Sequence, residues 1–119
     1  MRILIVEDEP DLLRALAQAL REEGYAVDTA TDGDDALFKA ENWEYDSVVL
    51  DIMLPKLDGW EVARRLKADP MTRAIPVIAV SGHAQPEHRR RAVEAGVDEY
   101  CVKPCTPGDL GAMIERHLR

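Results

Sequence analysis

Three short stretches of the chain, residues 3–6, 48–50 and 77–80, are entirely apolar and rich in β-branched side chains. Continuous apolar runs of this length are typical of strands that are buried on both faces, as parallel sheets require. Each run ends abruptly in a polar residue or a turn signal. The runs therefore predict the central strands of a parallel sheet with helices on both sides.

Helical patterns alternate with these strands. Helices are expected at 10–23, 36–43, 60–68, 85–95 and 107–118, further strands at 25–30 and 99–102, and a turn at 32–34. Pro10 and Pro107 fit first helical turns, and Gly24 and Gly96 fit helix ends. Five strands alternating with five helices predict an α/β fold, a doubly wound three-layer sandwich with right-handed crossovers. No repeat or linker interrupts the pattern, so we expect one domain over residues 1–119.

Composition excludes several classes of function. The formal net charge of −8, from 15 basic and 23 acidic residues, argues against nonspecific binding to nucleic acid or to an anionic membrane. No apolar run approaches about 18 residues, so no membrane span is expected. The first strand begins at once and leaves no room for a signal peptide. We therefore expect a cytoplasmic protein in which Cys101 and Cys105 are free thiols.

The residues that end the predicted strands carry compatible chemistry. Glu7 and Asp8 follow the first strand, Asp51 the third, Ser81 the fourth and Lys103 the fifth. In an open parallel sheet these ends share the edge where ligands bind. Taken singly, each residue fits a solvated loop or a helix cap. Together they form an acid cluster that a hard divalent cation would relieve, and oxygen ligands without His or Cys indicate Mg²⁺.

Four motifs carry a resemblance to a known family. They are Val6-Glu7-Asp8-Glu9, Val49-Leu50-Asp51-Ile52-Met53-Leu54-Pro55 with Asp58-Gly59, Val80-Ser81-Gly82, and Tyr100-Cys101-Val102-Lys103-Pro104. Asp51 and Ser81 are 30 positions apart, and Ser81 and Lys103 are 22 apart. The chain resembles the receiver domain of response regulators in two-component and phosphorelay signalling, over essentially its whole length. The resemblance implies a flavodoxin-like sheet in the order 2-1-3-4-5.

The resemblance also implies roles for the site residues. Asp51 would accept a phosphoryl group from a histidine kinase or a histidine phosphotransfer protein. Mg²⁺ would be bound directly by Asp8, Asp51 and the main-chain carbonyl of Met53, and by Glu7 through water. Ser81 and Lys103 would contact the phosphoryl oxygens. The protein would be a signalling switch that assists only its own phosphorylation and slow dephosphorylation, rather than an enzyme.

Output would follow from a movement at the fifth strand. Tyr100 matches the switch aromatic of similar proteins, which turns inward when Ser81 is drawn to the phosphate. The surface of the fourth helix, fifth strand and fifth helix would then bind an output protein, with no direct nucleic-acid or membrane contact. Dimerisation on phosphorylation is common in similar proteins. The bond before Pro104 is expected to be cis.

The chain departs from the family pattern at several positions. Cys105 replaces a common Phe, Gly82 a common Ala, and Ser81 the commoner Thr. Met53 and His83 stand where similar proteins tune loss of the phosphoryl group, and neither offers a carboxylate or amide to orient water. We therefore expect a persistent phosphoaspartate.

Other interpretations remain open on the residues alone. A haloacid-dehalogenase-type phosphatase uses similar groups, but Met53 stands where that class places a second Asp. A flavin or dinucleotide binder would need a Gly-rich phosphate loop, which is missing. The spacing of Cys and His does not favour zinc. Residues 88–91, His-Arg-Arg-Arg, form either a solvated helix face or a docking patch for an acidic partner, and Trp43 and Trp60 are expected to be packing residues.

Overall fold

The computed structural model describes residues 1–54, 58–82 and 85–117. Within these residues the strands are β1 (Arg2–Val6), β2 (Ala26–Ala30), β3 (Ser47–Asp51), β4 (Val77–Ser81) and β5 (Glu99–Val102). The helices are α1 (Pro10–Glu22), α2 (Gly33–Asn42), α3 (Gly59–Ala68), α4 (Pro86–Ala95) and α5 (Pro107–Arg116). Strands and helices alternate along the chain, as the sequence predicts.

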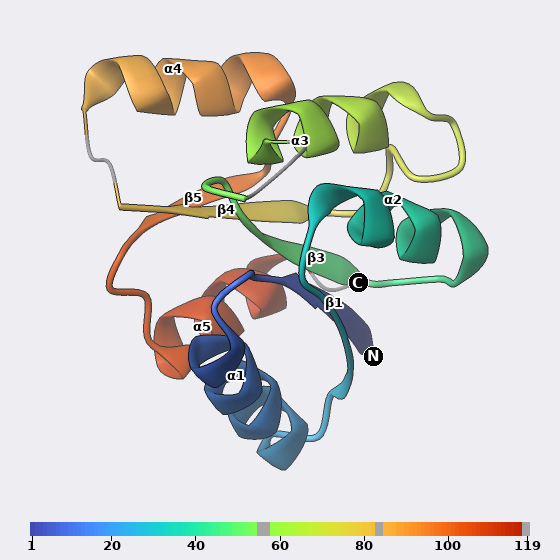
Figure 1. Cartoon of the computed structure of the whole chain (residues 1–119), viewed down its shortest axis with the longest axis vertical. Helices are drawn as coiled ribbons and strands as arrows, with labels where there is room; N and C mark the ends of the chain where they lie inside the picture. Colours follow the sequence, from blue (N-terminus) through green and yellow to red (C-terminus); the bar gives the residue numbers. More distant parts are fainter. Residues whose placement is uncertain (55–57, 83–84, 118–119) are drawn as a thin grey trace.

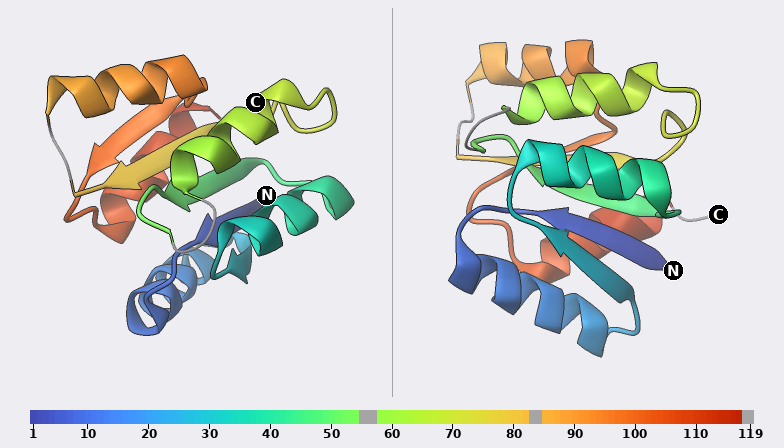
Figure 2. Two further views of the ribbon diagram at one scale, coloured as in Figure 1. Left: turned by 45° about the horizontal axis from the view of Figure 1, so that its top comes forward. Right: turned by 45° about the vertical axis from the view of Figure 1, so that its right-hand side comes forward.

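The five strands form one parallel sheet in the order β2-β1-β3-β4-β5. Helices α2, α3 and α4 cover one face of the sheet, and α1 and α5 cover the other (Figures 1 and 2). The predicted three-layer, doubly wound architecture and its strand order are therefore confirmed.

Two apolar clusters hold the layers together. Alternate residues of β1 serve different clusters because successive side chains of a strand point to opposite faces. Leu4 and Val6 belong to the cluster under α2, α3 and α4, whereas Ile3 and Ile5 belong to the cluster under α1 and α5. Burial on both faces explains why the central strands are continuously apolar rather than alternating.

The start of α2 corrects one prediction. Residues 32–34 were expected to form a turn before a helix at Ala36, but the helix begins at Gly33. Asp32 is its N-cap, and its side chain accepts a hydrogen bond from the backbone N–H of Asp35 at 2.8 Å. An Asp at this position satisfies a donor of the first helical turn, so the segment continues as a helix.

The two tryptophans have different environments. Trp60 is buried and packs in the core, as expected. Trp43 was also expected to be a packing residue, but half of its surface is exposed, at 51%. It makes an edge-on contact with the exposed Phe38 at 6.0 Å between ring centroids.

The strand register brings the predicted site to one edge. The last residue of one strand is aligned with the last or next-to-last residue of its neighbour, in the pairs Val6 with Leu50, Asp51 with Val80, and Ser81 with Val102. Because all five strands run in the same direction, the residues that follow them emerge at the same end of the sheet.

Candidate functional site

Asp51 is the last residue of the central strand β3 and is almost fully buried, at 4% exposure. Its Oδ1 accepts a hydrogen bond from the backbone N–H of Met53 at 2.9 Å. Its Oδ2 accepts one from the Lys103 ammonium at 3.1 Å. Strand pairing on both sides of β3 and these two donors fix the carboxylate at the edge of the sheet.

Glu7 and Asp8 bring two further carboxylates to Asp51. Glu7 continues from β1, where its backbone N–H donates to the carbonyl of Ala30 at 3.0 Å, and the residue is 4% exposed. Asp8 is exposed. One carboxylate oxygen from each of Glu7, Asp8 and Asp51 lies within 4.8 Å of the others, and among the described residues this is the acidic group that could hold a metal ion.

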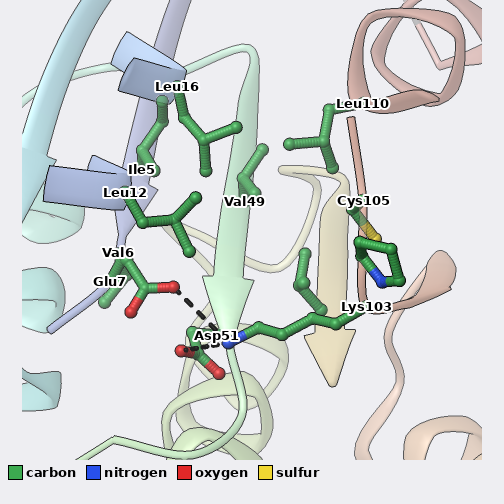
Figure 3. A pocket seen from close by; sticks show the side chains of 12 residues that line it. Ile5, Val6, Glu7, Leu12, Leu16, Val49, Asp51, Lys103, Cys105 and Leu110 are labelled. Atoms are coloured by element: carbon green, nitrogen blue, oxygen red, sulfur yellow. Dashed lines mark hydrogen bonds and ion pairs between the residues drawn. The ribbon is translucent and has the colours of Figure 1, made fainter. Parts of the chain in front are cut away.

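Lys103 partly balances this cluster. Its Nζ lies 3.1 Å from Asp51 and 3.6 Å from Glu7 (Figure 3). Burial acts to lower the pKa of Lys103, but the hydrogen bond and charge of Asp51, with those of Glu7, outweigh it and raise the pKa. The ammonium therefore stays charged, and one cation faces three acids.

Glu7 shows the cost of this excess of acid. Burial raises the pKa of Glu7 to about 7; a hydrogen bond from the backbone of Glu9 opposes the rise, and the neighbouring Asp51 adds to it. An ordinary exposed glutamate would be ionised well below that pH. A cation placed among these oxygens would remove the repulsion, so the residues present fit a hard divalent ion.

Ser81 and the turn after β5 complete the edge. Ser81 ends β4 and is fully buried. Its backbone carbonyl accepts a hydrogen bond from the backbone N–H of Lys103 at 2.7 Å, which extends the strand pairing by one residue. The bond between Lys103 and Pro104 is cis, as the resemblance led us to expect.

Gly59 lets α3 begin directly beside the end of β3. Its backbone N–H donates to the carbonyl of Ile52 at 3.0 Å. A Cβ at this position would lie 2.5 Å from the Ile52 Cα and 2.8 Å from the Asp51 carbonyl oxygen. Only glycine permits this approach without displacing the backbone that carries the carboxylate.

A cavity of about 400 Å³ lies beneath the acids, between the sheet and helices α1 and α5 (Figure 3). Its wall is apolar, and Glu7, Asp51 and Lys103 stand at one end. The apolar wall lowers the local polarity behind the charged groups and strengthens their interactions.

The other side of the site carries an aromatic stack that the sequence did not predict. The rings of Trp60 on α3 and Tyr100 on β5 are nearly parallel, with centroids 6.4 Å apart. Arg89 lies over the Tyr100 ring at 5.2 Å, and Arg91 lies over the Trp60 ring at 5.4 Å. Two of the arginines in segment 88–91 therefore contact aromatic rings of the same molecule.

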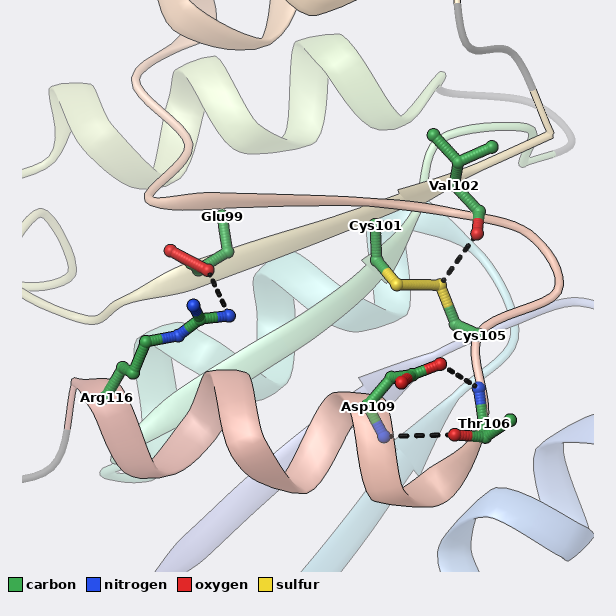
Figure 4. The surroundings of a disulfide bond; sticks show 7 residues. All are labelled: Glu99, Cys101, Val102, Cys105, Thr106, Asp109 and Arg116. Carbon is green, nitrogen blue, oxygen red and sulfur yellow. Dashed lines mark hydrogen bonds and ion pairs between the residues drawn. A yellow bond between two sulfur atoms is a disulfide. The ribbon is translucent and has the colours of Figure 1, made fainter.

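Cys101 and Cys105 correct the expectation of free thiols. They form a disulfide bond, with Cα atoms 6.3 Å apart (Figure 4). Cys101 is buried in β5, and Cys105 lies after the turn at Lys103 and Pro104. Free thiols were expected because the cytoplasm is reducing. The pairing follows instead from the turn at Lys103 and Pro104, which brings Cys105 close enough to Cys101 for a disulfide.

The sequence also predicted that Met53 and His83 tune loss of the phosphoryl group. Met53 follows β3 and is 60% exposed, and its backbone N–H donates to Asp51 Oδ1. His83 lies outside the described residues.

The comparisons with known proteins decide the family. A family profile described as the response regulator receiver domain matches residues 3–115. The chain belongs to the receiver-domain family. The chain is also 44% identical over 115 residues, 96% of its length, to the gliding motility regulatory protein of Myxococcus xanthus. That stretch is 14% of the relative, and the chain spans about half or less of the length of several curated relatives that it matches.

Solved receiver domains share the fold over the whole chain. A CheY-like receiver domain from Methanospirillum hungatei has a TM-score of 0.90 and 34% identity, covering 97% of this chain and 90% of that one. The receiver domain of the sensor histidine kinase PA1611 from Pseudomonas aeruginosa has a TM-score of 0.88 and 34% identity, covering 97% and 94%. That structure has a magnesium ion coordinated in its active-site cleft.

The receiver family confirms the resemblance drawn from the four motifs. Receiver domains are the phosphoacceptor modules of two-component signalling, and this chain is one of them. No helix among its described residues is long and apolar enough to cross a membrane.

Proposed function

We propose that Asp51 is the phosphoacceptor of this receiver domain, and that the domain occupies residues 1–119. The observation that carries the proposal is the convergence of Asp51 with Glu7, Asp8 and Lys103 at one edge of the sheet. The donor is the phosphohistidine of a histidine kinase or of a histidine phosphotransfer protein. An oxygen of Asp51 attacks phosphorus, a P–O bond forms, the P–N bond breaks, and the imidazole leaves.

The residues around Asp51 divide the work. The Lys103 ammonium already lies 3.1 Å from the carboxylate, so it can neutralise charge on the arriving phosphoryl oxygens. The Ser81 hydroxyl, buried at the end of the neighbouring strand, can donate a hydrogen bond to another oxygen. These groups are held by the strand ends, so little reorganisation is needed at the moment of transfer.

Mg²⁺ is the proposed cofactor. By resemblance to the family, Asp8, Asp51 and the main-chain carbonyl of Met53 would bind it directly, and Glu7 through water. One oxygen from each of the three carboxylates lies within 4.8 Å of the others, and hard cations prefer oxygen ligands. When bound, it would supply positive charge next to the transferred phosphoryl group. The single positive charge of Lys103 leaves two of the three carboxylates without a counter-charge, which supports binding of a divalent cation.

The proposed output surface comprises α4, β5 and α5. Tyr100 is half-buried on β5 beside Trp60, and Ser81 is one strand away. Movement of Ser81 toward a phosphate would change the packing around Tyr100 and release Arg89 and its neighbours on α4 for an acidic partner. A homodimer formed through this surface is the alternative output, and the solution mass with and without beryllofluoride distinguishes the two.

We place the switch in the cytoplasm, where histidine kinases present their phosphohistidine. It is proposed to act through proteins rather than by turning over a substrate. The exposed Met53 offers no group to orient an attacking water, which supports a persistent phosphoaspartate. Loss of radiolabel from purified, kinase-free protein measures its lifetime, and rapid loss would contradict this part of the proposal.

The central test is labelling by a small phosphodonor. Purified chain is exposed to acetyl phosphate with Mg²⁺, and intact mass is compared for the unmodified chain, Asp51→Asn and the exposed control Asp34→Asn. The unmodified chain and the control are expected to gain one phosphoryl group, and Asp51→Asn none. Labelling of Asp51→Asn at the same rate, or turnover of a generic phosphate ester, would refute the assignment.

A further inference from the structure

The disulfide encloses the residue that contacts the phosphoacceptor. Cys101 lies two positions before Lys103 and Cys105 two positions after it, and the bond between them closes a short loop around Lys103 and Pro104 (Figure 4). From within this loop the Lys103 ammonium reaches Asp51 at 3.1 Å and Glu7 at 3.6 Å. The bond therefore bears directly on where that ammonium lies.

Two anchors flank the loop. On one side, the backbone N–H of Lys103 donates to the Ser81 carbonyl at 2.7 Å, where strand pairing ends. On the other, Thr106 is the N-cap of α5, and its side chain and backbone exchange hydrogen bonds with Asp109 at 3.0 and 3.1 Å. The disulfide ties Cys105, just before this cap, back to Cys101 inside the sheet. It thus joins the end of β5 to the start of α5 across the active-site turn.

Breaking the bond would loosen this connection. A covalent link removes conformations that the loop could otherwise adopt, and a site gains most from groups that are held in place before reaction. Cys105 and Pro104 also line the cavity beneath Asp51, so movement of this segment changes that wall as well. The most direct consequence is a less fixed Lys103 ammonium.

The chemistry of opening is balanced by a dithiol. Cys105 is half-buried and Cys101 is 7% exposed, so a thiolate attacks the Cys105 sulfur. The S–S bond breaks, Cys101 leaves as a thiolate and takes up a proton, and a mixed disulfide remains on Cys105. The second thiol of the reductant then attacks its own sulfur in the mixed disulfide, releasing Cys105. The protein gains two electrons and two protons, and the dithiol becomes a disulfide.

We propose that Cys101 and Cys105 form a reversible redox site that controls phosphoryl transfer to Asp51 by positioning Lys103, with a cellular dithiol as its reductant. The proposal rests on the function proposed for Asp51. Disulfides are uncommon in cytoplasmic proteins, and those that form there are usually transient and redox-sensing. The disulfide form is the faster acceptor, and the dithiol form is the slower one.

The test compares the two redox forms of the full chain. The protein is oxidised with oxidised glutathione or reduced with dithiothreitol, the reagent is removed, and labelling by acetyl phosphate with Mg²⁺ is followed by intact mass. The reduced chain is expected to label about fivefold more slowly or worse, the lower end of ordinary coupling between sites. Cys105→Ser, and Cys101→Ala as a second variant, should match the reduced chain and show no response to either treatment.

A second readout separates coupling from simple loss of structure. Coupling between sites is reciprocal, so beryllofluoride with Mg²⁺ should shift the thiol–disulfide equilibrium toward the disulfide by the same factor that the disulfide strengthens beryllofluoride binding. A disulfide that merely stabilises the fold would shift the urea midpoint and leave this equilibrium unmoved, which would overturn the proposal. Equal labelling of both redox forms, or two free thiols after the oxidising treatment, would overturn it while leaving the role of Asp51 intact. Absence of label in both forms would overturn the role of Asp51 and this proposal together.

Discussion

At the amino end of the sheet the carboxylates pair with separate donors, whereas at the carboxyl end Asp51 and Glu7 share the Lys103 ammonium and Asp8 lies beside them. Asp98, before β5, accepts hydrogen bonds from Lys67 and from the backbone N–H of Val77, both at 2.8 Å. Asp46, before β3, accepts one from the backbone N–H of Arg2 at 2.8 Å. These acids complete the fold from within the chain.

Asp28 in β2 shows the same pattern as the amino-end acids. Burial acts to raise the pKa of Asp28, but hydrogen bonds from the Tyr45 hydroxyl and from Arg2 outweigh it and lower the pKa. At the carboxyl end the shift is opposite, because burial and Asp51 raise the pKa of Glu7 to about 7. One sheet thus lowers the pKa of one carboxyl, Asp28, and raises that of another, Glu7, according to burial and the donors beside each.

The largest expected effect is at the amino end. Asp98→Ala removes the partner of Lys67 and leaves the buried Val77 N–H without its acceptor, so the free energy of unfolding should fall by about 2 to 3 kcal/mol. Urea unfolding measures it. Asp11→Ala, which breaks the exposed pair with Arg14, is the matched control and should change stability little. An equal loss of stability in the two variants would show that the hydrogen bonds of Asp98 contribute no more than an exposed ion pair.

The same change of charge should act oppositely at the carboxyl end. Glu7→Gln removes a buried charge beside Asp51 and keeps an oxygen for the Glu9 N–H, so without divalent cations the free energy of unfolding should rise by about 1 to 2 kcal/mol near pH 8. Urea unfolding in a chelator measures it. Mg²⁺ should stabilise the unmodified chain more than the variant, and a destabilised variant in chelator would contradict the contrast.

The fold was predictable because its signals are local. Continuous apolar runs marked β1, β3 and β4, and the strand ends marked the site, since parallel strands must deliver their last residues to one edge. Glu7, Asp51 and Lys103 could be brought together from sequence for this reason alone. Their roles as acceptor and ligands remain predictions.

The features that the sequence did not predict depend on tertiary geometry. The disulfide depends on how the turn at Pro104 brings Cys105 back to β5, which spacing alone does not determine. The Arg89–Tyr100 contact depends on where α4 lies across β5 and α3, although the polar character of α4 was visible. The two cysteines that flank Lys103 at equal distances along the sequence were the available signal for the disulfide.

Stability should also depend on pH through Glu7. The pKa of Glu7 is about 7 when folded, against 4.5 in a model peptide, so the folded chain binds more protons between these values. The contribution of Glu7 to stability without metal should therefore be fully present below this window and fall by about 1 kcal/mol or more as pH rises through it. The free energy of unfolding of the unmodified chain minus that of Glu7→Gln, measured across this pH range, isolates the contribution of the Glu7 carboxyl group. A flat difference would show that burial does not penalise its charge.

The smallest effect should appear at Asp28 in β2, with the opposite sign of pH dependence. Tyr45→Phe removes the 2.7 Å hydrogen bond to Asp28, whose side chain is 34% exposed, so solvent screening limits the loss to about 0.5 to 1 kcal/mol at neutral pH. Because the pKa of Asp28 is lowered in the folded chain, its contribution is present above the ordinary aspartate range and is lost as pH falls through the folded value. The difference in free energy of unfolding between the unmodified chain and Tyr45→Phe should therefore vanish in acid. In the same range Glu7 is protonated, and its burial no longer costs stability. If both differences moved in the same direction with pH, the environments of Asp28 and Glu7 would not differ in the way described.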